Sequence, residues 1–281
     1  MLDIRDLTLS ITGEAGHVDI LRDVSLSVAR GEALGLVGES GSGKSMTLRC
    51  LLRIEPPGST VGGTIALDGA DVLALAGEPL RRMRASSVSM IAQNPHAVLN
   101  PVAPIRRYLQ EGMHDAQGLS LKAARMRAGE LLERVGLDDV DRILNSYPHE
   151  LSGGMLQRVV IAGAIAGQPK LLLADEPTTA LDVTTQAEVM AILDDCRREL
   201  GMALLFVTHD LDLAGAVCDR IAVMKDGEIV ETGVPDHLRD HPAHPYTRQL
   251  MDSRPAGITW TPDAAVPGEI LDETEHDDLL R

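Results

Sequence analysis

Aromatic side chains and basic charge are both scarce in this sequence. Only 2% of the residues are aromatic, so the stacking platforms that bind single-stranded nucleic acid are few. The formal net charge is −16, and so acidic a chain is a poor candidate for a general nucleic-acid-binding surface. We therefore expect no nucleic-acid partner.

Cysteine and long apolar runs are also limited. The three cysteines, Cys50, Cys196 and Cys218, form no Cys-x-x-Cys pair, which suits a reducing compartment and argues against a zinc or iron–sulfur site. The longest apolar run, near 159–166, is too short to span a bilayer, and the acidic start of the chain is unlike a signal peptide. We expect a soluble chain that could dock on a membrane protein.

A glycine-rich stretch stands at residues 38–45, with the sequence Gly-Glu-Ser-Gly-Ser-Gly-Lys-Ser. It follows the apolar run 34–37 and precedes a helix expected over 46–52, which is the context of a phosphate-binding loop. Glycines let successive backbone N–H groups face a polyphosphate, and the helix N-terminus adds positive potential. We expect Lys44 to reach the outer phosphates and Ser45 to ligate magnesium.

The hydrophobic pattern predicts an α/β fold. Continuous apolar strands over 34–37, 88–92, 170–174 and 203–207 are typical of a parallel sheet that is covered on both faces. Alternating strands within 2–30 and 61–70 predict an antiparallel layer, and a hairpin is expected at 221–231. Helices are expected over 121–135, 155–166 and 183–200, with Cys196 in the core. Residues 95–155 show few strand signals and are interpreted as a helical insertion.

Four apolar strands each lead to a polar element that could serve phosphate chemistry. The first leads to the phosphate loop, and the others end at Gln93, at Asp175-Glu176 and near His209. Ligands of open α/β sheets bind outside the carboxyl ends of the strands, so these residues should converge on one nucleotide. The sequence therefore predicts a single hydrolytic site.

Charge and reach suggest a role for each of these residues. γ-Phosphate hydrolysis needs magnesium, an oriented water and compensation of negative charge. Asp175 suits a direct or outer metal ligand, and Glu176 suits a base or a water-positioning group. Gln93 can bridge water and metal, so the expected metal set is Ser45, Gln93 and Asp175. His209 can donate to the γ-phosphate or orient Glu176.

These motifs together resemble those of ABC ATPases over roughly residues 1–250. Residues 151–157 resemble the signature motif, residues 171–176 the Walker B motif with its catalytic glutamate, and residues 179–182 the D-loop, which ends at Asp182. The resemblance implies ATP and magnesium as cofactors, and a P-loop NTPase (RecA-like) core with an antiparallel β layer and a helical insertion. The implied ATP contacts are Gly38, Glu39, Ser40, Gly41, Ser42, Gly43, Lys44, Ser45 and Met46.

The Ser-Gly-Gly element is a second helix N-terminus that could face an anion. In ABC ATPases the signature of one cassette completes the ATP site of the other, so the resemblance implies a dimer of cassettes. The residues implied to face the ATP of the partner cassette are Ser152, Gly153, Gly154 and Gln157.

Further motifs resemble the ATPases of dipeptide, oligopeptide and nickel importers. They are Gln-Asn-Pro at 93–95, Leu-Asn-Pro at 99–101, Tyr-Pro-His-Glu at 147–150, the stretch 174–182, and His-Pro-Tyr-Thr at 244–247. This resemblance implies a second and different ATPase chain, two membrane permease subunits, an extracytoplasmic solute-binding protein as an indirect partner, and a peripheral position on the cytoplasmic face of the membrane. It also implies that the proline-rich stretch after Gln93 faces the permease.

Two departures and several alternatives remain. The region where relatives place an adenine-stacking aromatic contains His17 instead, and no cysteine follows Cys218, so we expect no iron–sulfur cluster. An accessory ATPase of a soluble carbon–phosphorus lyase complex is the main alternative. An ABC ATPase of translation or DNA repair is disfavoured by the single cassette and the acidic balance. Residues 251–281 form an acidic extension that we expect to be partly disordered.

Overall fold

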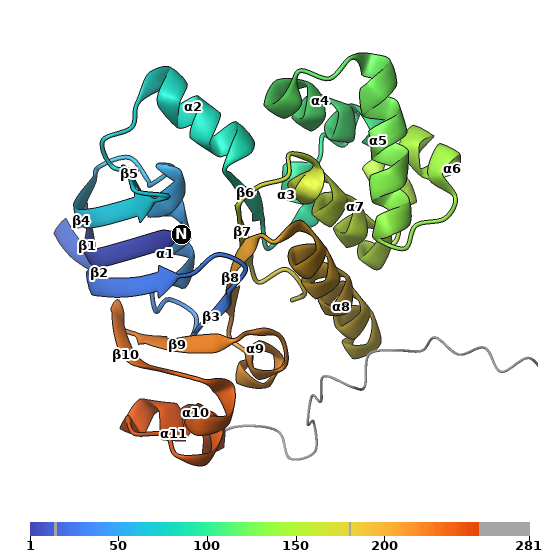
Figure 1. Cartoon of the computed structure of the whole chain (residues 1–281). Coiled ribbons are helices and arrows are strands. Elements are labelled where there is room, and N and C mark those ends of the chain that lie inside the picture. Colours follow the sequence, from blue (N-terminus) through green and yellow to red (C-terminus); the bar gives the residue numbers. More distant parts are fainter. Residues whose placement is uncertain (14–15, 180, 253–281) are drawn as a thin grey trace, which may run out of the picture.

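The computed structural model describes residues 1–13, 16–179 and 181–252, and the chain forms two sheets with helices around them (Figure 1). The first sheet is antiparallel, with the strand order β2-β1-β4-β5. Its strands are β1 (Leu2–Gly13), β2 (Gly16–Val28), β4 (Ser59–Leu67) and β5 (Ala70–Asp71). Leu2 lies opposite Val28 of β2 and Leu67 of β4, so one face of this sheet is a continuous apolar surface.

The second sheet has six strands in the order β10-β9-β3-β8-β7-β6. Its strands are β3 (Ala33–Val37), β6 (Val88–Ile91), β7 (Leu171–Asp175), β8 (Ala203–Thr208), β9 (Arg220–Lys225) and β10 (Glu228–Gly233). The five strands from β9 to β6 are parallel, and β10 pairs with β9 in antiparallel orientation. The carboxyl ends of β3, β6, β7 and β8 therefore lie along one edge of the sheet.

Period-two alternation along the parallel strands divides the core into two layers. Leu34 and Leu36 of β3 pack in the cluster between the two sheets, which also contains Leu48 and Leu51. Val37 belongs to the other cluster, which lies against the helices. Because both faces of these strands are buried, their sequences are continuously apolar.

The helices cover the second sheet and form the insertion, which lies at the upper right in Figure 1. They are α1 (Lys44–Leu52), α2 (Gly77–Ser86), α3 (Pro95–Val98), α4 (Ile105–Gln117), α5 (Leu121–Arg134), α6 (Val140–Asn145), the 3-10 turn η1 (Pro148–Glu150), α7 (Gly153–Ala166), α8 (Val183–Leu200), α9 (Leu211–Val217), α10 (Pro235–Asp240) and α11 (Pro245–Asp252). Ser120, Ser152 and Asp182 accept backbone hydrogen bonds as the N-caps of α5, α7 and α8.

The expected α/β fold with an antiparallel layer and a helical insertion is confirmed. The helix predicted over 183–200 has those bounds, and Cys196 is buried in the core at 2% exposure. Helix α1 begins at Lys44, two residues earlier than predicted, so Lys44 and Ser45 belong to its first turn. Helices α2, α9, α10 and α11 were not predicted. No helix in the described part of the chain combines the length and hydropathy needed to span a bilayer. The acidic extension lies outside the described residues apart from 251 and 252.

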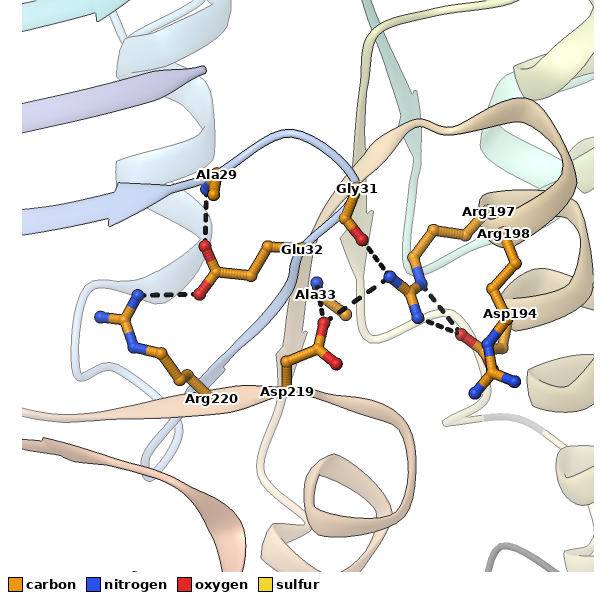
Figure 2. Close-up of polar contacts among 9 residues, drawn as sticks. All are labelled: Ala29, Gly31, Glu32, Ala33, Asp194, Arg197, Arg198, Asp219 and Arg220. Carbon is orange, nitrogen blue, oxygen red and sulfur yellow. Dashed lines mark hydrogen bonds and ion pairs between the residues drawn. The ribbon is translucent and has the colours of Figure 1, made fainter.

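An ion-pair network around the buried Arg197 joins α8 to the amino ends of β3 and β9 (Figure 2). Arg197 is only 7% exposed, pairs with Asp194 at 2.8 Å, and donates to the carbonyl of Gly31. Asp219 lies 3.6 Å from Arg197 and accepts from the N–H of Ala33 at 2.8 Å. This network fixes the start of β3, while the phosphate loop leaves from the other end of the same strand.

Candidate functional site

The phosphate loop is shaped by close backbone approaches. Gly41 and Gly43 have φ values of 85° and 109°, which L side chains rarely adopt. A side chain at Gly38 would collide with the carbonyl oxygen of Met224, and a Cβ at Gly43 would lie 2.7 Å from a methyl carbon of Leu21. Glycine is therefore required here both by conformation and by space.

Lys44 is held inside this loop. Its Nζ donates to the carbonyl oxygens of Gly38 at 2.7 Å and Glu39 at 2.8 Å. An ammonium group has three donors, so one remains available for a phosphate oxygen. Burial lowers the pKa of Lys44, although the charges of Glu176 and Asp175 oppose this effect. The position of Lys44 fits the predicted role in binding outer phosphates.

Ser45 and Asp175 meet at the predicted metal position. The Ser45 hydroxyl donates to Asp175 Oδ1 at 2.8 Å, which joins the start of α1 to the end of β7. Asp175 is buried, and this desolvation raises its pKa, while the hydrogen bond from Ser45 acts in the opposite direction. A buried carboxylate next to a hydroxyl is a suitable pair of oxygen ligands for magnesium.

The carboxylate of Glu176 contacts three side chains that come from motifs predicted from the sequence. Its Oε2 lies 3.2 Å from Gln93 Nε2, 2.9 Å from Thr179 Oγ1 and 3.4 Å from His209 Nδ1. Its backbone has φ 45°, a left-handed conformation that is uncommon for residues other than glycine. Glu176 directly follows Asp175, the last residue of β7, and its side chain meets groups from the neighbouring strand ends, while Asp175 contacts Ser45.

The chain's own groups fit a bound nucleotide with magnesium. The hydroxyl oxygen of Ser42 is buried in the loop and has no hydrogen-bond partner among the described residues. A buried hydroxyl without a partner is costly, and a phosphate oxygen would satisfy it. Ser45, Asp175 and Gln93 are the residues that would hold the metal, and residues 38–46 would surround the phosphates.

The signature residues lie apart from this loop, at the start of α7. The Ser152 hydroxyl accepts from the N–H of Met155 at 3.3 Å, and Ser152 and Gly153 are exposed. A Cβ at Gly154 would lie 2.7 Å from Thr185 Cγ2, so this glycine allows α7 to approach α8. Gln157 is different, because its side chain is buried at 2% exposure and its Nε2 has no partner among the described residues.

Asp182 has a local structural role in this chain. Its carboxylate accepts from the N–H of Thr185 at 3.1 Å and from the Thr185 hydroxyl at 2.7 Å. These hydrogen bonds lower the pKa of Asp182. Ala180 of the expected D-loop lies outside the described residues.

Sequence reasoning missed two contacts at the site. Thr179, which the sequence identifies only as part of the D-loop, hydrogen-bonds to Glu176, and Tyr246 of α11 accepts from the N–H of Glu39 at 3.0 Å. Tyr246 belongs to the His-Pro-Tyr-Thr motif, but this motif alone does not indicate that Tyr246 contacts Glu39. His17 is exposed and lies between Thr12 and Asp19, at 3.2 and 3.1 Å.

Comparison with known proteins decides the family. Residues 21–179 match the family described as "ABC transporter". The chain belongs to the ABC transporter family and is an ATP-binding cassette ATPase. The fold agrees with this assignment. The chain is similar to the dimeric ATP-binding cassette MJ0796, which is bound to ADP and Pi in a post-hydrolysis state. The TM-score is 0.74 and the sequence identity is 30%, and the match covers 84% of this chain and 99% of that chain.

Two relatives of this cassette carry peptide-transport names. The oligopeptide transport ATP-binding protein OppD of Bacillus subtilis (strain 168) is 42% identical over 257 residues, which cover 91% of this chain and 72% of the relative. A Brucella abortus (strain 2308) protein with the provisional name peptide import ATP-binding protein is 45% identical over 256 residues, covering 91% of this chain and 77% of the relative.

Proposed function

We propose that this cassette is the ATP-hydrolysing subunit of an ABC importer that energises peptide uptake across the cytoplasmic membrane. The observation that carries the proposal is the joining of Gln93, Glu176 and His209 beside the loop of Lys44, in a chain whose relatives bear peptide-transport names. Those names favour peptides over nickel as the cargo. They also favour transport over the alternative of an accessory ATPase in a soluble carbon–phosphorus lyase complex.

In the proposed ATP hydrolysis each side chain of the site has a distinct role. Bound magnesium supplies Lewis-acid polarisation of the phosphoryl oxygens. Lys44 directs its ammonium at the outer phosphates, and the loop N–H groups compensate their charge. Glu176 accepts a proton from the attacking water or orients that water, and Gln93, Thr179 and His209 hold its carboxylate in place.

We also propose a second ATPase chain, different from this one, as the partner cassette. Ser152 and Gly153 are exposed at a helix N-terminus, and within the described residues no hydrogen bond joins Ser152 to the phosphate loop. An N-terminus of this kind suits an anion supplied by another molecule. The dimeric state of the cassette MJ0796 supports the pairing of two cassettes.

A groove after Gln93 is the place that we propose for the permease. It has a volume of about 120 Å³ and is lined by residues of 98–111 together with Pro148. Val102, in the same segment of the chain, is 80% exposed, which is unusual for a large apolar side chain and is typical of an interaction surface. Because α3 directly follows Gln93, contact here would couple a permease to the hydrolytic site. The chain would then be peripheral on the cytoplasmic face, with a solute-binding protein on the other side.

The domain division is part of the same proposal. Residues 1–250 would form the cassette, with the helical insertion over about 95–155, and 251–281 would be an acidic extension. The proposal as a whole is tested by purifying the complex in mild detergent through a tag on this chain. Two co-purifying membrane permeases and loss of peptide uptake on deletion are expected. A complex of soluble chains only would contradict it.

A further inference from the structure

The last described helix touches the phosphate loop. Helix α11 (Pro245–Asp252) carries Tyr246, whose hydroxyl accepts a hydrogen bond from the N–H of Glu39 at 3.0 Å. Tyr246 is 3% exposed, whereas Glu39 is exposed, so this hydrogen bond is partly buried. Two segments that are 207 positions apart in the sequence are thus joined at the first turn of the loop.

The ring of Tyr246 is held from several sides. Lys225, at the end of β9, places its Nζ 4.8 Å from the ring centroid, which is a cation–π distance. Glu231 of β10 accepts from the N–H groups of Ala243 and His244, at 2.8 and 3.0 Å, and so fixes the segment before α11. The position of the Tyr246 hydroxyl is therefore set by the β9–β10 hairpin and not by a mobile side chain.

The Gly38–Glu39 segment is bound on two sides by different groups. Lys44 donates to the carbonyl oxygens of both residues, while Tyr246 accepts from the N–H of Glu39. The same hairpin supports the loop at a second point, because the N–H of Gly227 donates to the carbonyl of Ser42 at 3.0 Å. Without these contacts the loop would have high conformational freedom, because residues 40–43 have the sequence Ser-Gly-Ser-Gly.

We propose that Tyr246 is a positioning residue of the ATP site, whose hydroxyl holds the Gly38–Glu39 segment in the geometry that nucleotide binding needs. The C-terminal helix thereby sets the affinity of this chain for ATP. The inference rests on the proposed function, because it concerns how the same loop takes its nucleotide. A loop ordered before binding loses less entropy when the ligand arrives, so the contact acts on affinity.

The expected signature is a change in binding without a change in chemistry. Tyr246→Phe keeps the ring and its contact with Lys225 but removes the acceptor of the Glu39 N–H. We expect the dissociation constant for ATP to rise about threefold to tenfold, which is the scale of one net hydrogen bond. The rate at saturating ATP should stay within about twofold, because Glu176, Gln93 and His209 are untouched. A purely structural role would not separate the two quantities in this way.

The test measures binding of a non-hydrolysable ATP analogue with magnesium to the full chain by calorimetry, for the wild type and two variants. Tyr147→Phe is the control, because it removes the phenolic hydroxyl of a tyrosine that precedes η1 and has no hydrogen bond to the phosphate loop among the described residues, and it should bind as the wild type does. Amide hydrogen exchange in the nucleotide-free chain is the second readout, and exchange at Glu39 should be faster in Tyr246→Phe.

The outcomes separate this inference from the proposed function. If the wild type binds no ATP, the proposed function itself fails. If the wild type binds and Tyr246→Phe binds equally well, the inference is overturned. If Tyr246→Phe does not fold, Lys225→Gln replaces it, since this variant leaves the hydroxyl but frees the ring. Weaker ATP binding by Lys225→Gln supports the inference, and unchanged binding overturns it.

Discussion

His209 Nδ1 lies 3.4 Å from Glu176 Oε2, across the carboxyl ends of the adjacent parallel strands β7 and β8. The Glu176 carboxylate is mostly buried and the imidazole is largely exposed, with side-chain exposures of 16% and 58%. The imidazole can therefore reach both the carboxylate and the space outside the strand ends. This contact brings together two motifs that are far apart in the sequence.

Replacing His209 by alanine should slow hydrolysis while leaving ATP binding nearly unchanged. The variant loses a group that orients Glu176 or donates to the γ-phosphate, and we expect the turnover of the assembled complex to fall by about 10²-fold. Phosphate release and ATP binding are measured on the same preparation. His241→Ala, at the exposed C-cap of α10, is the control and should retain full turnover. Equal turnover of both variants would show that His209 has no such role.

Asp175→Asn should stabilise the chain in the absence of nucleotide and weaken its response to magnesium. Burial raises the pKa of Asp175 above its unfolded value, so the folded state holds the proton more tightly. The ionised Asp175 therefore lowers the stability of the folded state. This loss develops as the pH rises from the unfolded pKa to the folded pKa, and it is complete at neutral pH. A gain of about 1 kcal/mol would raise Tm by about 2–4 °C.

The measurement for Asp175→Asn is Tm at neutral pH with and without ATP and magnesium. Asparagine can still accept from Ser45, so the fold should be intact. We expect a higher Tm without ligand and a smaller shift on adding ATP with magnesium. A lower Tm without ligand, or an undiminished shift with ligand, would contradict the assignment.

Arg197→Met should destabilise the chain without altering its ATP affinity. The arginine is buried among Asp194, Asp219 and the carbonyl of Gly31 at the amino ends of the strands (Figure 2). We expect a loss of about 3 kcal/mol in the free energy of unfolding, near the lower end for removing one partner of a buried pair. Urea unfolding checks this value, and Arg198→Met, whose side chain is 70% exposed, should change stability by less than about 0.5 kcal/mol.

Ser152→Arg should abolish the ATPase activity of the assembled complex but not the binding of ATP to the isolated chain. The bulky cation would occupy the helix N-terminus that we propose faces the partner's nucleotide. Ser120→Arg is a matched control, because Ser120 is also an N-cap serine, on α5, and has no role in the signature. Loss of activity in Ser120→Arg as well, or full activity in Ser152→Arg, would contradict the role of Ser152 at the ATP of the partner cassette.

Local patterns in the sequence were sufficient for much of the fold. The 183–200 helix has an N-cap aspartate, an apolar stripe and a terminal Gly201 in the left-handed region, so its limits could be predicted. Helix α2 could not, because Met83 is its only buried residue and no side chain caps its start at Gly77. The 5-residue strands were found because both faces are buried and their sequences are continuously apolar.

The grouping of the site residues could be predicted from the strand ends, but their backbone conformation and tertiary contacts could not. Gln93, Asp175, Glu176 and His209 could be grouped because parallel strands deliver them to one edge. The left-handed backbone of Glu176 and the bond between Tyr246 and Glu39 depend on tertiary packing, which no local pattern encodes. The burial of Gln157 was likewise not visible, since its place in the signature motif suggested an exposed side chain.

The central claim is that Glu176 performs the water-activating step of an importer's ATPase, and one measurement tests it most directly. Phosphate release is measured for the detergent-purified complex with wild-type chain and with Glu176→Gln, together with ATP retention. We expect Glu176→Gln to bind ATP and to release phosphate at least about 10²-fold more slowly, because the amide cannot accept the proton. Turnover of the variant close to that of the wild type would contradict the account.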